Sequence, residues 1–203
     1  MSDEIPVRVE VRFPISAGAV PIDHGYLLFS ALSSVLGDLH GASWLAVHPL
    51  RGTPLPGAML AVKRNAQALR LRVVPVELPR VLGLAGKTLD VGGCALRLGK
   101  SNLHPIKPFA SLGARIVVLK GFTEARVFGQ ALRRQLDDLH VACSVEVRSR
   151  RIVSIEGSRI VGFATQLHGL EQAASLRVQY AGIGGRQRMG CGGFVPLRRT
   201  RVA

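Results

Sequence analysis

The sequence predicts an α+β protein in which two small units, each a sheet carrying helices, follow one another along the chain. Segments that alternate apolar and charged residues are typical of half-buried strands, and segments with an apolar stripe at helical spacing are typical of surface helices. The two kinds of segment follow the same order in both halves of the chain. With 203 residues, 47% of them apolar, the protein can bury one good core or two small ones.

The first half opens with a strand and a helix. VRVEVRF, residues 7–13, places valine and phenylalanine on one face and charged residues on the other. After a turn marked by glycine and proline, residues 24–39 form a helix whose apolar face contains Leu28, Ala31, Leu32, Val35 and Leu39. Further strands are predicted in SWLAVHPL, GAMLAVKR, ALRLRVV, KTLDVGG and CALRLG, with a short helix in VELPRVLGL.

The second half repeats this order. ARIVVLKG is predicted as a strand, and a helix from about Thr123 aligns Ala125, Phe128, Leu132, Leu136 and Leu139. Three strands (CSVEVRS, RRIVSIEG and RIVGFATQL), a helix (LEQAASLRVQYA) and a closing strand (GGFVPL) follow.

The repeated order of strand, helix, strands, helix and strand is that of the ferredoxin-like (RRM-like, βαββαβ) fold. Both helices then cover one face of an antiparallel sheet, and the other face or a cleft between domains is left for a ligand. KSNLHPIKPFASLG, which contains Pro105 and Pro108, interrupts the pattern. We therefore predict two domains, residues 1–107 and 108–203, with the junction in this segment.

The composition favours a polyanionic partner. Lys and Arg number 27 against 13 Asp and Glu, a net charge of +14 spread along the whole chain, which fits a folded surface that binds nucleic acid. A basic protein without such a partner is the alternative. No apolar run is long enough to cross a membrane and no signal peptide is visible, so we expect a cytoplasmic protein. The three cysteines are far apart and indicate neither a zinc site nor a disulfide framework.

A glycine-rich loop joins the last helix to the closing strand. YAGIGGRQRMGCGGFVP, residues 180–196, contains six glycines and two arginines but neither a Walker ending nor a dinucleotide fingerprint, so we expect no nucleotide cofactor. Glycine lets backbone N–H groups approach a phosphate closely, and nearby arginines add charge. This predicts phosphate binding by Gly182, Gly184, Gly185, Arg186 and Arg188. The alternative is a tight connection that needs glycine only for its left-handed backbone.

Residues 182–196, together with VPIDHGYLLFSALSSVL after the first strand, resemble the CRISPR-associated repeat-processing endoribonucleases of the Cas6 family, in the RAMP superfamily. The resemblance implies two ferredoxin-like domains and a CRISPR repeat RNA (pre-crRNA), often a hairpin, as substrate. It also implies cleavage without metal or cofactor to give crRNA, and it allows other CRISPR effector-complex subunits as partners.

Metal-free RNA cleavage uses the substrate's 2′-OH as nucleophile and needs a general base, a general acid and cationic stabilisation. No D-x-D or H-E-x-x-H pattern suggests a metal-dependent mechanism. His24, where the positive end of the helix disfavours an imidazolium, is the first candidate; His40, at the far end of this helix, is the second. Tyr26 is a candidate for orienting a phosphate or hydroxyl. The structural alternatives are a helix cap at Asp23 followed by His24, a helix C-terminal contact for His40 and core packing for Tyr26.

Phosphate contacts are expected to dominate RNA binding, because aromatic residues make up only 5% of the chain and no RNP-type aromatic strand is visible. The remaining candidates lie in predicted loops or strand ends: Arg51, Lys63, Arg64, Lys100 and Lys107. A non-catalytic RNA-binding subunit with the same fold, and a basic assembly factor that processes no RNA, are the competing functional hypotheses.

Overall fold

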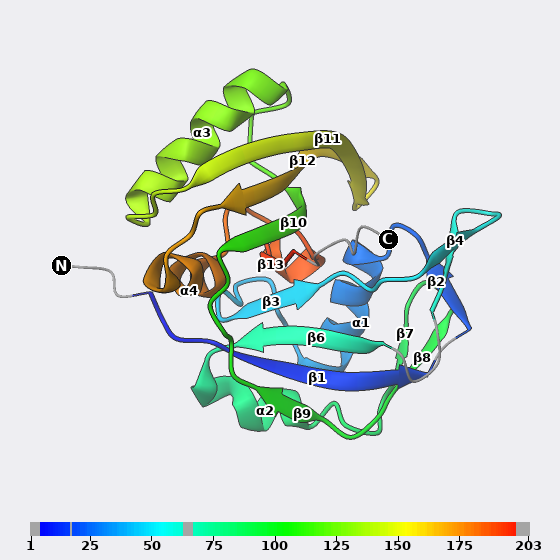
Figure 1. Cartoon of the computed structure of the whole chain (residues 1–203). Coiled ribbons are helices and arrows are strands. Elements are labelled where there is room, and N and C mark those ends of the chain that lie inside the picture. The colour runs from blue at the N-terminus through cyan, green and yellow to red at the C-terminus, as the bar shows by residue number, and fades with distance from the viewer. Residues whose placement is uncertain (1–4, 17, 63–66, 198–203) are drawn as a thin grey trace, which may run out of the picture.

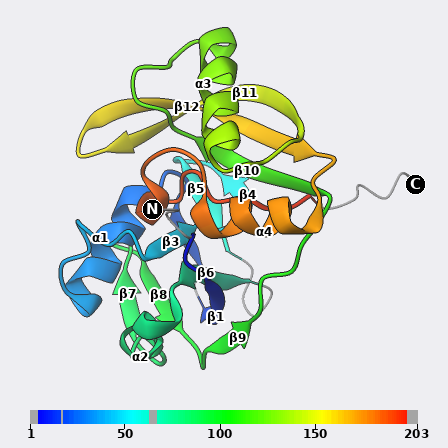
Figure 2. The same cartoon turned by 90° about the vertical axis from the view of Figure 1, so that its left-hand side faces the viewer.

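The computed structural model describes residues 5–16, 18–62 and 67–197. Two sheet-and-helix units lie one above the other in Figure 1, the first built from residues 9–104 and the second from residues 111–196. Figure 2 shows the same arrangement from the side, with α1 beside the first unit and α3 above the second. The predicted α+β class with two ferredoxin-like units is confirmed, because both sheets have the strand order of that fold.

The first unit has the sheet order β3-β6-β1-β9, all antiparallel, which is the ferredoxin-like order when the strands are numbered along the chain. Its main elements are β1 (Val9–Ser16), α1 (Gly25–Leu36), β3 (Leu45–His48), β6 (Ala68–Val73), η1 (Pro75–Glu77), α2 (Leu78–Leu82) and β9 (Asn102–His104). Smaller additions are the sheet of β2 (Ala19–Pro21), β5 (Met59–Ala61) and β4 (Thr53–Leu55), and the hairpin of β7 (Thr88–Asp90) and β8 (Ala95–Leu98).

The second unit has the sheet order β11-β12-β10-β13, again the ferredoxin-like order. Its elements are β10 (Ser111–Val117), α3 (Ala125–Asp138), β11 (Ser144–Ile155), β12 (Ser158–His168), α4 (Gln172–Ala181), η2 (Gln187–Met189) and β13 (Val195–Pro196). Leu132 of α3 and Val178 of α4 are fully buried in one core with Leu112 and Leu167 of the sheet. Both long helices therefore cover the same face of this sheet.

The faces of the two sheets that carry no helix border a common cleft. In the first sheet, Leu69 and Leu71 belong to the core under α1, so the alternate residue Arg70 points to the other face. In the second sheet, Leu112 is in the core and the neighbouring Gly113 faces the cleft, where a cavity is lined by residues of both units. The alternation of side chains along strands thus places the charged residues of both sheets in the space between them.

The structure differs from the predicted elements in three places. The segments CSVEVRS and RRIVSIEG, predicted as two strands, form the single strand β11, whose register shifts between Val147 and Arg150. β9 lies inside the segment predicted to be a junction and supplies the last strand of the first unit. The short strands β2 and β4 were not predicted, because three-residue strands carry too little periodicity. The exact domain boundary at residue 107 stays a prediction.

The start of α1 also differs from expectation. His24, not Asp23, is the residue that precedes the first helical turn, and its side chain makes no capping bond. The Asp23 carboxylate instead accepts a hydrogen bond of 2.6 Å from the N–H of Ser154, near the tip of the β11–β12 hairpin. Across the described ranges, no helix is both long and apolar enough to cross a membrane.

Candidate active site and nucleic-acid interface

His24 is held in the interior by its two ring nitrogens. The side chain is 1% exposed; Nδ1 donates to the carbonyl oxygen of Pro21 at 3.0 Å, and Nε2 accepts from the N–H of Leu50 at 2.9 Å. These partners fix the neutral tautomer with its proton on Nδ1. Burial lowers the pKa of His24, which agrees with the neutral state predicted from sequence although the main cause is desolvation. Both ring nitrogens thus have backbone partners in this structure, and the helix cap at Asp23 named in the structural alternative is not formed; the catalytic role of His24 stays a prediction.

His40 lies at the surface just beyond the end of α1. Its backbone N–H donates to the Asp38 carboxylate at 2.8 Å, and its ring meets the ring of Phe29 edge-on, with centroids 5.5 Å apart and planes at 90°. The preceding residue, Leu39, is fully buried and anchors the segment in the core. His40 is therefore an exposed imidazole on a fixed backbone, which is what a proton-transfer group needs.

Tyr26 is half-buried against the first core, and its ring centroid lies 6.2 Å from that of Phe29. This position agrees with the packing alternative for Tyr26. The Phe29 ring, 3% exposed, thus has Tyr26 on one side and His40 on another.

Arg188 places the glycine-rich loop against Phe29, next to the segment that carries His40. Its guanidinium lies over the Phe29 ring, 5.9 Å from the centroid, and Nη1 donates to the carbonyl oxygen of Leu39 at 2.9 Å. His40 follows Leu39 directly in the chain. The structure therefore brings together His40, predicted from the first helix, and Arg188, predicted from the loop almost 150 residues later.

The glycines of the loop have a structural explanation. Gly184 and Gly192 have φ of 74° and 67°, and a Cβ atom there would lie 2.4 Å and 2.1 Å from the carbonyl oxygens of Val118 and Ile183. Such a connection can be built only with glycine at these two positions.

The loop amides predicted to bind phosphate already have protein partners. The N–H of Gly182 donates to the Val178 carbonyl at 2.9 Å, that of Gly185 to the Val118 carbonyl at 3.0 Å, and that of Gly184 to the Gln135 side chain at 2.9 Å. A phosphate would have to displace these partners to bind the amides, so phosphate binding by the three glycines stays a prediction. Arg186 is exposed in the loop and has the left-handed conformation, at φ 63°.

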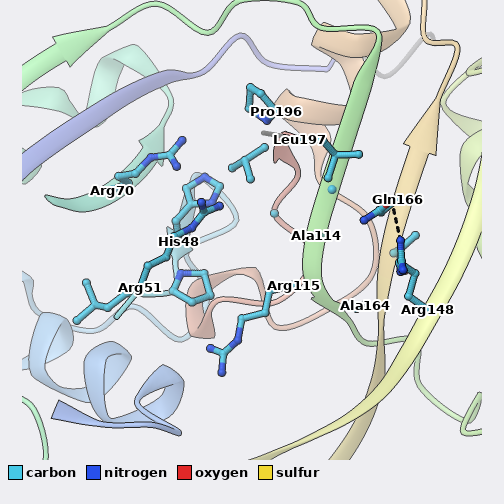
Figure 3. A pocket seen from close by; sticks show the side chains of 16 residues that line it. His48, Arg51, Arg70, Ala114, Arg115, Arg148, Ala164, Gln166, Pro196 and Leu197 are labelled. Carbon is cyan, nitrogen blue, oxygen red and sulfur yellow. Dashed lines mark hydrogen bonds between the residues drawn. The ribbon is translucent and has the colours of Figure 1, made fainter. Parts of the chain in front are cut away.

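The cleft between the sheets contains a cavity of about 380 Å³ in which arginines gather (Figure 3). The described lining includes Arg51, Arg70, Arg115 and Arg148 and no carboxylate; from outside the lining, Glu10 pairs with Arg70 at 2.7 Å and Glu146 pairs with Arg148 at 3.3 Å. Arg70 and Arg51 come from the first unit, and Arg115 and Arg148 come from β10 and β11 of the second (Figure 3). A concave site of this charge is suited to phosphate groups.

His48 forms part of the floor of this cavity. Its side chain is 5% exposed, and in the described structure Nε2 has no hydrogen-bond partner. Burial, followed by the charge of Arg72, holds the pKa of His48 well below its ordinary value, so the imidazole is neutral. A neutral group with one unpaired nitrogen can donate to or accept from a ligand in the cavity, depending on its tautomer.

The other predicted contacts are scattered. Arg51 lies at the cavity, as described, whereas Lys100 and Lys107 are exposed outside its lining. Lys63 and Arg64 lie outside the described residues. The sequence alone did not single out Arg70, Arg115, Arg148 and His48. A polar residue on the outer face of a strand is expected to face solvent, and only the fold shows that a second sheet lies opposite. The alternation in ALRLRVV was the available signal, since it places two arginines on one face.

Comparison with known proteins gives a consistent result. The family model described as Cas6 Crispr matches residues 9–199. A protein of Myxococcus xanthus (strain DK1622) named CRISPR-associated endonuclease Cas6 is 44% identical over 194 residues, which are 96% of this chain and 84% of that protein.

Two solved structures share the fold at low sequence identity. A Cas6-related protein from Pyrococcus furiosus superimposes with a TM-score of 0.67 at 11% identity, over 96% of this chain and 100% of that one. A structure described as an RAMP protein binding different RNA substrates gives 0.65 at 12% identity, over 93% of this chain and 98% of that one.

Proposed function

Because the chain belongs to the Cas6 family of CRISPR-associated proteins, we propose that it is an endoribonuclease that binds CRISPR repeat RNA and cuts pre-crRNA, without a metal ion, to produce crRNA. The observation that carries the proposal is the meeting of His40 and Arg188 at Phe29. A proton carrier and a permanent cation are two of the groups that such a cleavage needs from the protein.

The reaction is an internal transesterification. A general base removes the proton of the 2′-OH, the 2′-oxygen attacks the adjacent phosphorus, and the bond to the 5′-oxygen breaks as that oxygen takes up a proton. The products are a 2′,3′-cyclic phosphate and a 5′-OH. His40 is the proton carrier in this scheme, because its ring is exposed whereas both nitrogens of His24 are bonded to backbone.

Arginines of the loop stabilise the extra negative charge that builds up on the phosphate oxygens. Arg188 stands beside His40 through their shared contact with Phe29, and Arg186 is exposed in the same loop. Guanidinium groups remain protonated throughout and match phosphate oxygens in geometry. The glycine-rich loop thus acts through its charged side chains, and its glycines set the shape that carries them.

The arginine-lined cleft is the proposed path for a part of the repeat away from the cut. Its cations, Arg51, Arg70, Arg115 and Arg148, bind backbone phosphates regardless of base sequence. A cytoplasmic location and docking to other CRISPR effector subunits are further parts of the proposal, since the RNA substrate is made in the cytoplasm and the products of such enzymes serve as guides.

The decisive experiment is single-turnover cleavage of the repeat RNA of the protein's own CRISPR locus, with EDTA present. The wild type is expected to cut at one site and to leave a cyclic phosphate, and a 2′-deoxy substitution at the scissile nucleotide should abolish cutting. His40→Ala should lower the rate at least a hundredfold while it binds RNA normally. His140→Asn is the matched control, because His140 is also an exposed histidine that follows a helix, in the other unit.

Each alternative has its own outcome. Tight binding without any cut would indicate the non-catalytic RNA-binding subunit. Equal binding of unrelated RNAs, again without a cut, would indicate the basic assembly factor. Cleavage that EDTA abolishes would refute metal independence, and full activity of His40→Ala would assign the proton transfer to another group.

A further inference from the structure

One buried guanidinium closes the base of the glycine-rich loop. Arg72, on β6, is 2% exposed, and its Nη1 donates to the carbonyl oxygens of Gln179 at 3.0 Å and of Phe194 at 2.7 Å. Gln179 lies directly before the loop, and Phe194 lies near its end, after the last glycine. A side chain of the first sheet therefore hydrogen-bonds to both ends of a loop that belongs to the second unit.

The Gln179 carbonyl needs a partner from outside its helix. It lies in the last turn of α4, where carbonyl groups have no N–H one turn further on within the helix. The cation also suits the negative end of the helix dipole. Arg72 Nη2 donates in addition to the Gln179 side chain at 3.2 Å, and that side chain donates onward to the Lys107 carbonyl at 2.9 Å.

Glu10 supplies the counter-charge of the Arg72 guanidinium. Its carboxylate, 3% exposed, lies 3.5 Å from Arg72 Nε and also binds Arg70 at 2.7 Å. Burial alone would raise the pKa of Glu10, but hydrogen bonds and the charge of Arg70 outweigh it and lower the pKa to about 2. Burial lowers the pKa of Arg72 to about 10, so both groups are charged near neutral pH.

The position of the loop matters because it carries Arg188. The interior of the loop is bonded to the second unit, for example through the N–H groups of Gly184 and Gly192, and Arg72 adds a tie from both ends of the loop to the first unit. Arg72 is 2% exposed, so we expect it to make little direct contact with RNA. Whatever it contributes to cleavage must therefore pass through the loop.

We propose that Arg72, supported by Glu10, is a positioning residue that fixes the glycine-rich loop so that Arg188 stands beside His40. The inference rests on the proposed nuclease function. Loss of Arg72 should slow the chemical step much more than it weakens RNA binding, because the arginines that line the cleft stay in place.

The test compares Arg72→Lys with Arg134→Lys, a charge-preserving change at an exposed position of α3. A lysine ammonium carries all its donors on one nitrogen, so it cannot bond the two carbonyl groups and also engage the Gln179 side chain and Glu10, as Arg72 does through Nη2 and Nε. Single-turnover cleavage by Arg72→Lys should fall at least tenfold, while its Kd for a repeat RNA carrying a 2′-deoxy scissile nucleotide changes less than threefold. Limited trypsin digestion should cut faster after Arg186 and Arg188 in Arg72→Lys, and Arg134→Lys should match wild type in all three measurements.

Contrary results are clear-cut. An unchanged cleavage rate in Arg72→Lys, or a rate that falls only as much as binding, would overturn the proposal. If Arg72→Lys does not fold, Glu10→Gln takes its place, since it keeps the arginine and removes its counter-charge. The cleavage rate of Glu10→Gln should again fall much more than its affinity for RNA. If wild type cuts no RNA, the proposed function fails, whereas the trypsin result still shows whether Arg72 holds the loop.

Discussion

Replacing His24 with alanine should destabilise the protein without removing the proton carrier. The change deletes two hydrogen bonds, at 3.0 Å to the Pro21 carbonyl and 2.9 Å from the Leu50 N–H. Each such bond contributes about 1 kcal/mol net, and a buried donor left unpaired, as at Leu50, costs about 1–3 kcal/mol. With the lost packing of a ring that is 1% exposed, the free energy of unfolding should fall by about 3 kcal/mol.

The assay is urea unfolding followed by circular dichroism at 25 °C. With an m-value of about 2 kcal/mol/M, a loss of about 3 kcal/mol lowers the unfolding midpoint by about 1.5 M. His24→Asn keeps one donor and one acceptor and should recover part of the loss. His40→Ala, at an exposed position, should shift the free energy of unfolding by less than about 0.5 kcal/mol.

Cleavage by the same variants completes the comparison. Domains of this size commonly have about 5–15 kcal/mol of stability, so His24→Ala should remain mostly folded and, per folded molecule, cut within threefold of wild type. The opposite pattern, an unchanged urea midpoint with cleavage abolished in His24→Ala, would refute the reasoning. It would mean that His24 leaves its two backbone partners to take part in the reaction.

Three further predictions concern the cleft, the acid response and the loop. Arg115→Gln and Arg148→Gln should each weaken binding of any repeat RNA and lower the slope of log Kd against log salt by about 1. Filter binding across salt concentrations measures this slope, and an unchanged slope would show that RNA does not pass through the cleft. Because the folded-state pKa of His48 lies well below its unfolded value, its contribution to the free energy of unfolding is complete above about pH 6.5 and falls as the pH drops below that value. In urea titrations at pH 5 and 7, His48→Gln should lose less stability on acidification than wild type. An equal loss in both proteins would contradict a buried, neutral His48. Gly192→Ala, whose Cβ would lie 2.1 Å from a carbonyl oxygen at φ 67°, should lower the melting temperature by several degrees, whereas Gly185→Ala, with nothing within 4 Å, should leave it within about 1 °C; equal effects would show that the loop adapts.

The element order could be predicted because it depends on local patterns. The alternation of residues 7–13 and the apolar stripe of residues 24–39 each fix which side chains face a core, whatever that core contains. The observed strand β1 and helix α1 follow these patterns within a few residues. β9 was missed because its three residues lie next to prolines and are held by pairing with β1, which is a non-local interaction.

The candidate site could be predicted only in part. Arg188 stood out because arginine between glycines is unusual, and His40 stood out through its helix end. Their meeting at Phe29 could not be read from the sequence, since the contact joins residues almost 150 positions apart. Our proposal that His40 rather than His24 transfers the proton also depends on the fold, because the bond from the Leu50 N–H to the His24 ring depends on how β3 leaves the sheet.

By itself, the sequence determined the class of fold, the positive charge that suits a polyanion, and the glycine-rich loop with its arginines. Periodicity and composition can be evaluated without knowing which segments meet in space, and this is why they could be used for prediction. The tertiary structure alone decided which histidine is exposed, which loop amides are already bonded, and which arginines share a cleft. Burial and hydrogen bonding are properties of pairs of segments that meet in space: Leu50 lies 26 residues from His24, and Phe194 lies 122 residues from Arg72.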